Sequence, residues 1–221
     1  MGPHARTLVF NPVVIPPKPV VDHKPEPREI ADDFESSAVG ALPQYAAIWG
    51  GASPSTVIVT DEKAAEGEHS LKFTDTPGPQ HAWEPELGYR VALAGDGAVV
   101  SSFDVLLEPK AVFYHELRAS RDVADTGPRL VFNDEGKLLA DDTFLMDVPR
   151  GVWFHVELVC PIGAKADGAY TLTVTVPGQP PKKFDNVPCF NSEFNKVDWA
   201  IYQAFAETNT AFYLDNVRVG F

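Results

Sequence analysis

A short stretch of the chain carries side chains that are well suited to binding a ligand. Polar and apolar residues alternate over 112–119, and Tyr114, Glu116 and Arg118 fall on one face, because successive side chains of a strand point to opposite sides. Arg129, on the next expected strand, could lie beside them. An aromatic ring that stacks on C–H surfaces, together with charged groups that bind hydroxyls, is typical of sugar recognition. An exposed polar face, or an inter-strand ion pair between Glu116 and Arg129, is the alternative.

Two more aromatic residues are candidates for ligand contact. Trp83 and Tyr89 lie in or beside the Pro- and Gly-rich segment 76–88, and binding residues are often carried by loops. Trp49 and Trp199 are expected in the core instead.

The elements that must position these residues are strands. Val, Phe, Thr, Tyr and Trp are plentiful, and 20 Pro and 16 Gly punctuate the sequence, which is strand-and-turn composition. No segment sustains helical spacing over three turns. The expected strands are 57–60, 69–74, 89–93, 98–107, 112–119, 129–133, 137–140, 143–147, 153–160, 170–176, 182–184, 197–205 and 212–219.

This many short strands without crossover helices predicts an all-β fold, a jelly-roll β-sandwich of two antiparallel sheets. The segment DDFE at 32–35 and the strand at 212–217 look like a first and a last strand that pair, which closes the domain at 30–221.

Several motifs resemble a known class. DFE at 33–35, G-x-x-S-L-K at 67–72 and YLDNV at 213–217 recur together in jelly-roll carbohydrate-binding modules, and G-x-W-x-H at 151–155 is similar to a hairpin of concanavalin A-like lectin and glucanase domains. The resemblance implies a non-catalytic module that binds a polysaccharide or oligosaccharide for an attached enzyme. His155, in this hairpin, is expected to be a packed or hydrogen-bonded strand residue and not a catalytic one.

The same resemblance implies a structural calcium ion. In such modules it lies where the opening motif, the loop before S-L-K and the closing motif meet, which here would engage Glu35, Glu66, a main-chain oxygen near Ser70, and Asp215. Calcium prefers carboxylate and carbonyl oxygens of this kind. Ordinary turn and edge hydrogen bonds are the alternative for these acids.

The sequence gives less support for a catalytic function. The E-x-D-x-x-E strand of sandwich glucanases is absent. Residues 114–118 do resemble the E-L-R strand of jelly-roll alginate lyases, but the companion Q-I-H motif is missing. A polysaccharide lyase and a structural, protein-contacting sandwich therefore remain as alternatives.

The formal charge of −13 argues against a nucleic-acid partner, and no apolar run reaches the roughly 18 residues that would cross a membrane. Residues 1–29 are rich in Pro and are expected to form an extended linker to a neighbouring domain, with a strand at 7–14 as the alternative. The resemblance to secreted modules implies an extracellular protein. Since no signal peptide is visible, we expect the chain to be a piece of a longer secreted polypeptide. Cys160 and Cys189 could form a disulfide or remain as buried thiols.

Overall fold

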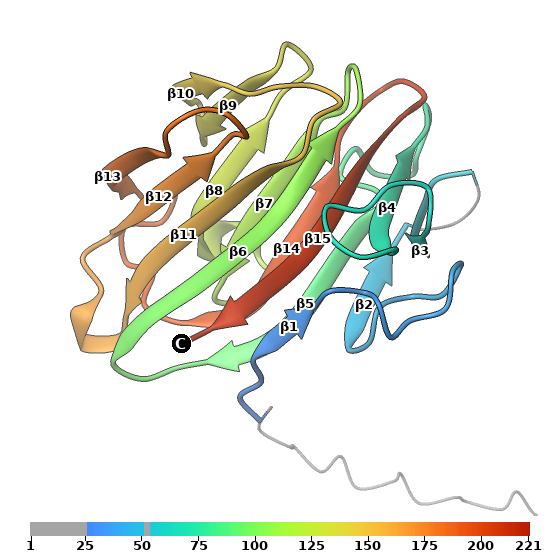
Figure 1. Cartoon of the computed structure of the whole chain (residues 1–221). Coiled ribbons are helices and arrows are strands. Elements are labelled where there is room, and N and C mark those ends of the chain that lie inside the picture. Colours follow the sequence, from blue (N-terminus) through green and yellow to red (C-terminus); the bar gives the residue numbers. More distant parts are fainter. Residues whose placement is uncertain (1–25, 51–53) are drawn as a thin grey trace, which may run out of the picture.

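Two antiparallel sheets packed against each other make up the fold (Figure 1). The computed structural model describes residues 26–50 and 54–221. Most of the predicted linker, and the alternative strand at 7–14, lie outside these residues. No helix among them is long and apolar enough to cross a membrane.

The first sheet has eight strands, in the order β13-β12-β11-β6-β15-β4-β3, with β1 paired to β15. Its strands are β1 (Ile30–Asp32), β3 (Thr56–Thr60), β4 (Ser70–Asp75), β6 (Gly97–Leu107), β11 (Phe154–Ile162), β12 (Ala169–Thr175), β13 (Lys182–Pro188) and β15 (Thr210–Gly220). Asp32 pairs with Val217, so the predicted contact between the two ends of the domain is confirmed.

The second sheet has seven strands, in the order β10-β9-β8-β7-β14-β5-β2. Its strands are β2 (Ala46–Trp49), β5 (Glu86–Leu93), β7 (Phe113–Arg118), β8 (Thr126–Phe132), β9 (Lys137–Ala140), β10 (Thr143–Asp147) and β14 (Val197–Ala204). Two single-turn 3-10 helices, Val123–Asp125 and Gly163–Lys165, complete the described elements.

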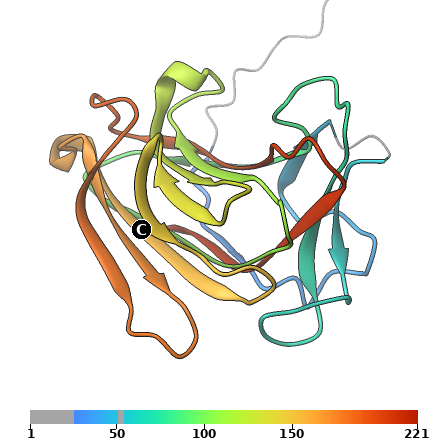
Figure 2. The same cartoon turned by 90° about the horizontal axis from the view of Figure 1, so that it is seen from above.

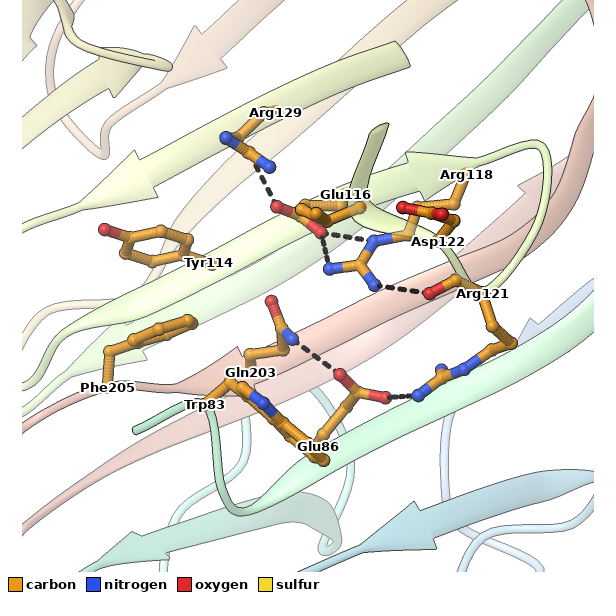
Figure 3. A pocket seen from close by; sticks show the side chains of 11 residues that line it. Trp83, Glu86, Tyr114, Glu116, Arg118, Arg121, Asp122, Arg129, Gln203 and Phe205 are labelled. Atoms are coloured by element: carbon orange, nitrogen blue, oxygen red, sulfur yellow. Dashed lines mark hydrogen bonds and ion pairs between the residues drawn. The ribbon is translucent and has the colours of Figure 1, made fainter. Parts of the chain in front are cut away.

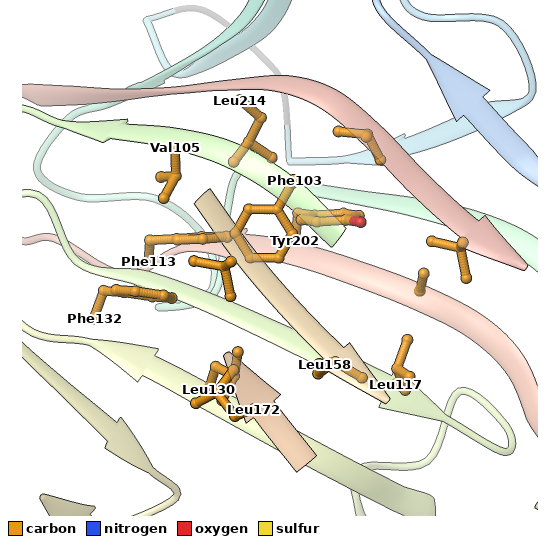
Figure 4. Close-up of a cluster of buried hydrophobic side chains, with 14 of the residues drawn as sticks. Phe103, Val105, Phe113, Leu117, Leu130, Phe132, Leu158, Leu172, Tyr202 and Leu214 are labelled. Atoms are coloured by element: carbon orange, nitrogen blue, oxygen red, sulfur yellow. The ribbon is translucent and has the colours of Figure 1, made fainter. Parts of the chain in front are cut away.

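The inner faces of the two sheets enclose one core (Figures 2 and 4). Phe103 of the first sheet meets Phe113 and Tyr202 of the second edge to face, with ring centroids 5.7 and 5.8 Å apart. All three side chains are essentially inaccessible to solvent. Because the inner faces are filled in this way, the residues of β7 that alternate with Phe113, namely Tyr114, Glu116 and Arg118, point outward.

Most of the predicted strands are present, and two differences concern the second sheet. The sequence missed β2, and β5 begins at Glu86 instead of Tyr89. Pro85 and Gly88 suggested a loop. Gly88 is in fact inside a paired strand, where a Cβ atom would come within 3.0 Å of Trp49 and 3.2 Å of Ile201, so the glycine makes room for neighbouring side chains.

The two cysteines are free, buried thiols. Cys160 is on β11, and Cys189 directly follows β13. This agrees with the second of the two alternatives for this pair.

Candidate functional site

The outer face of the seven-stranded sheet contains a pocket of about 570 Å³ (Figure 3). Its size is within the usual range of small-ligand sites, roughly 300–1,000 Å³. The pocket is lined by Trp83, Glu86, Tyr114, Glu116, Arg118, Arg121, Asp122, Val123, Arg129, Gln203 and Phe205.

Strand alternation and register bring the central residues of the pocket together. Tyr114, Glu116 and Arg118 share the outer face of β7, as predicted. Gln203 of β14 pairs with Tyr114 on one side and with Glu86 of β5 on the other. Directly paired residues place their side chains on the same face, so Tyr114, Gln203 and Glu86 form one row across three strands.

Glu116 is the centre of the first ion-pair cluster. Its Oε1 accepts a hydrogen bond from Nε of Arg129 at 2.6 Å, and its Oε2 accepts one from Nε of Arg118, also at 2.6 Å. The exposed fractions of the side chains are 2% for Glu116, 8% for Arg118 and 13% for Arg129. The inter-strand ion pair between Glu116 and Arg129 is therefore present. It was the alternative to a binding role, but both residues also line the pocket.

Glu86 is the centre of the second cluster. Its Oε1 accepts from Nη2 of Arg121 at 2.5 Å, and its Oε2 accepts from Nε2 of Gln203 at 2.5 Å. The Gln203 side chain is buried, and its Oε1 has no hydrogen-bond partner among the described residues. In Figure 3 this oxygen points away from Glu86, toward the side of the pocket where Tyr114 and Glu116 lie.

The charges that line the pocket balance. Three acidic residues, Glu86, Glu116 and Asp122, stand against three arginines, Arg118, Arg121 and Arg129. Each arginine already has a carboxylate partner, and Arg129 has a second one, because it also donates to Asp141 at 3.1 Å. The pocket therefore presents oriented hydrogen-bonding groups without a net charge.

Aromatic rings form the walls of the pocket. Tyr114 stacks on Phe205 with ring centroids 4.1 Å apart, and Trp83 stacks on His81 at 5.0 Å. Burial raises the pKa of the Tyr114 phenol, so the hydroxyl keeps its proton and can donate a hydrogen bond at neutral pH.

The structure corrects the prediction for three aromatic residues. Tyr89 is fully buried in the core, because it occupies an inward position of β5, and it cannot contact a ligand on the outer face. Trp49 and Trp199 are not core residues: both are half-buried and lie on the outer side of the second sheet. The strand that the sequence missed, β2, carries Trp49.

Several lining residues were not predicted, although the sequence held a signal for two of them. Gln203 is a polar residue within the expected strand 197–205, and Phe205 lies two positions further along, so an extended chain places both on one face. Glu86, Arg121 and Asp122 had no such signal, because their place depends on strand pairing and on the loop between β7 and β8.

His115 and His155 lie away from the pocket. His115 is fully buried, and burial lowers its pKa to about 3, so the ring is neutral. Its Nδ1 donates to the carbonyl oxygen of Ile201 at 3.0 Å. His155 bonds to Asp104 at 2.8 Å, which confirms the expected role as a hydrogen-bonded strand residue.

The predicted calcium ligands surround the segment 63–70 without converging on one point. Asp215 accepts hydrogen bonds from the backbone N–H groups of Ala65, Glu66 and Asn216. These N–H donors stabilise the charged carboxylate. Burial has the larger, opposite effect and raises the pKa of Asp215 to about 6.

The side chains of Glu35 and Ser70 also take part in hydrogen bonds. Glu35 accepts from the N–H groups of Glu68 and His69, and the Ser70 hydroxyl donates to the Lys63 carbonyl. Among the described residues, no group of three or more His, Cys, Asp or Glu is placed to hold a metal. Calcium at this place stays a prediction for experiment.

The fold is that of the concanavalin A-like jelly-roll proteins. No protein-family model matches the sequence, and no curated protein matches it. Among solved structures, the chain is similar to an endo-β-1,4-glucuronan lyase from the fungus Trichoderma reesei, with 15% identity, a TM-score of 0.58, and coverage of 82% of this chain and 93% of the other.

Two further solved structures have the same fold. The alginate lyase from Aplysia kurodai has 9% identity, a TM-score of 0.57 and coverage of 82% and 97%; lectin II from Ulex europaeus has 9% identity, a TM-score of 0.51 and coverage of 87% and 97%. Two of these neighbours are named as polysaccharide lyases and one as a lectin, and what the chain shares with them is the fold.

Proposed function

We propose that the pocket on the seven-stranded sheet binds an uncharged polysaccharide or oligosaccharide without cleaving it. In this proposal the chain is a carbohydrate-binding module of a larger, exported carbohydrate-active protein, joined to a neighbouring domain through the Pro-rich segment. In the same proposal the chain binds neither nucleic acid nor a membrane.

The observation that carries the proposal is the unpartnered amide oxygen of Gln203 in a pocket of balanced charge. A buried acceptor without a partner costs about 1–3 kcal/mol. The oxygen itself is closed to solvent, so in this proposal the Gln203 amide turns toward the pocket when a ligand hydroxyl donates to it. Arg129 also lines the pocket, and among the described residues its Nη2 takes part in neither of that residue's two side-chain bonds, so it is a further donor. Donor, acceptor and the stacked rings of Tyr114 and Phe205 together suit a sugar ring.

Charge favours an uncharged sugar over a uronate. A polyanion would need unpaired cationic groups, yet Arg118, Arg121 and Arg129 are each paired with a carboxylate. The net charge of −13 would also repel a polyanion.

Polysaccharide lyase activity is a second candidate, since two of the neighbours above are named as lyases. Lyase chemistry needs a group that removes a proton next to the uronate carboxyl. His115, the histidine of the lyase-like strand, faces the core with a pKa of about 3. Tyr114 lines the pocket, but its pKa is raised above the ordinary phenol value, which makes it a poorer base at neutral pH.

Affinity electrophoresis against a panel of neutral and uronate polysaccharides tests the proposal. We expect retardation in a neutral polysaccharide, reduced in Tyr114→Ala, with no ultraviolet-absorbing unsaturated product from any uronate. Such a product would establish a lyase. Absence of retardation in every polysaccharide would favour a structural, protein-contacting sandwich.

A further inference from the structure

A pair of tryptophans extends the outer face of the seven-stranded sheet beyond the pocket. Trp199 on β14 and Trp49 at the end of β2 meet edge to face, with ring centroids 5.8 Å apart and an interplanar angle of 70°. Neither belongs to the lining of the pocket, and both are half-buried.

Register connects this pair to the pocket. Trp49 is paired with Glu86, which is paired with Gln203, which is paired with Tyr114. One row of outward side chains therefore crosses four adjacent strands. Adjacent strands are about 4.8 Å apart, so the row from Tyr114 to Trp49 spans roughly 14 Å.

Arg121 joins the two regions physically. Its guanidinium group binds Glu86 within the pocket and lies 3.9 Å from the ring centroid of Trp49. The same group is 5.3 Å from the Trp199 ring. The arginine is thus held in place by an ion pair on one side and an indole on the other.

The tryptophans have room because Gly88 has no side chain. A Cβ atom at Gly88 would come within 3.0 Å of Trp49 and 3.3 Å of Trp199. On the outer side of the sheet these rings contribute nothing to packing between the two sheets. Aromatic rings that lie outside the core and continue a row of hydrogen-bonding groups are suited to stack on the apolar faces of successive sugar rings.

We propose that Trp49 and Trp199 form a second subsite, which binds the part of an uncharged oligosaccharide that extends beyond the pocket across β5 toward β2. This inference rests on the proposed function. It adds that affinity depends on the length of the oligosaccharide, and that the indoles carry this dependence.

Calorimetric titration with cello-, xylo- and manno-oligosaccharides of two to six units tests the subsite. We expect wild-type affinity for at least one series to rise with length. Trp199→Ala and Trp49→Ala should weaken binding of the six-unit sugar roughly 3- to 10-fold, the size of one lost stacking contact. Binding of the two-unit sugar should weaken less than binding of the six-unit sugar.

Trp153→Ala is the matched control, because Trp153 contacts Tyr213 on the eight-stranded sheet, away from the pocket. Fluorescence gives an independent readout if the alanine variants do not fold. The chain has four tryptophans, so in a Trp83→Phe, Trp153→Phe variant the emission comes from Trp49 and Trp199 alone. It should change more with the six-unit sugar than with the two-unit sugar.

The outcomes separate the two proposals. If no sugar of any length or polysaccharide binds the wild type, the proposed function fails, and the subsite fails with it. If the wild type binds and Tyr114→Ala weakens binding, while both tryptophan variants bind the six-unit sugar as the wild type does, only the subsite is overturned. An emission unchanged by a bound six-unit sugar would also overturn it.

Discussion

Glu116→Gln is the most informative single change in the pocket. The substitution keeps the shape of the side chain but removes the charge that two arginines share. Glu116 is 2% exposed, and Arg118 and Arg129 are 8% and 13% exposed, so water cannot replace the lost partner well.

The expected cost follows from this burial. Removing one partner of a buried ion pair typically destabilises a protein by about 3–5 kcal/mol, because the remaining charge is left uncompensated. Arg129 keeps its bond to Asp141, which places the expectation at the lower end, about 3 kcal/mol. For a protein of this size, 1 kcal/mol corresponds to roughly 2–4 °C in melting temperature, so the Tm should fall by about 6–12 °C.

Thermal and urea unfolding measure this loss. Glu135→Gln is the matched control, because Glu135 pairs with Lys137 at the exposed surface, where ion pairs contribute little. A Glu116→Gln variant that melts within 1 °C of wild type, as the control is expected to, would refute the reasoning. It would mean that solvent or a rearranged arginine compensates the missing charge.

Three other predictions concern the ligand, pH and calcium. Tyr114→Ala should weaken binding of a neutral polysaccharide by about 1–2 kcal/mol in affinity electrophoresis, with the fold intact in circular dichroism, because the ring stacks in the pocket. Burial raises the pKa of Asp75 from 3.8 to about 6, so stability from its proton is fully present below pH 3.8 and is lost as pH rises through 6. The urea midpoint of wild type relative to Asp75→Asn should therefore fall between pH 4 and 7, and a constant difference would contradict this. Calcium, as the sequence predicts it, should raise the Tm and a chelator should lower it, with both effects lost in Asp215→Ala; a Tm indifferent to both removes the ion.

The sequence was sufficient for the strands whose alternation is strong. The outward face of β7 with Tyr114, Glu116 and Arg118 follows directly from the two-residue period, and the pairing of the first and last strands follows from their patterns. Local signals were misleading where tertiary pairing overrides them. Gly88 has the chemistry of a turn but lies in a paired strand, and for this reason Tyr89 was assigned to a ligand-binding loop instead of the core.

The partners of the pocket residues required the structure for a different reason. Glu86 and Gln203 are 117 positions apart and meet because β5 and β14 are neighbours. Strand order is not encoded in local periodicity. The Glu86–Arg121 pair further depends on the conformation of the loop after β7.

The buried charges themselves argue for a binding role. Replacing a buried ion cluster as a whole by apolar residues of similar volume is often neutral or stabilising, so stability alone does not explain a cluster on an outer face. A Glu116→Leu, Arg118→Met, Arg129→Met variant should therefore unfold at a Tm above that of Glu116→Gln, because no buried uncompensated charge remains and Asp141, which loses Arg129, is exposed to water. The same variant should lose retardation in the neutral polysaccharide that binds wild type, since two of the three arginine donors of the pocket are gone. Retained binding with recovered stability would show that the cluster has no part in recognition, and would leave Tyr114, Phe205 and Gln203 as the contacts that hold the sugar.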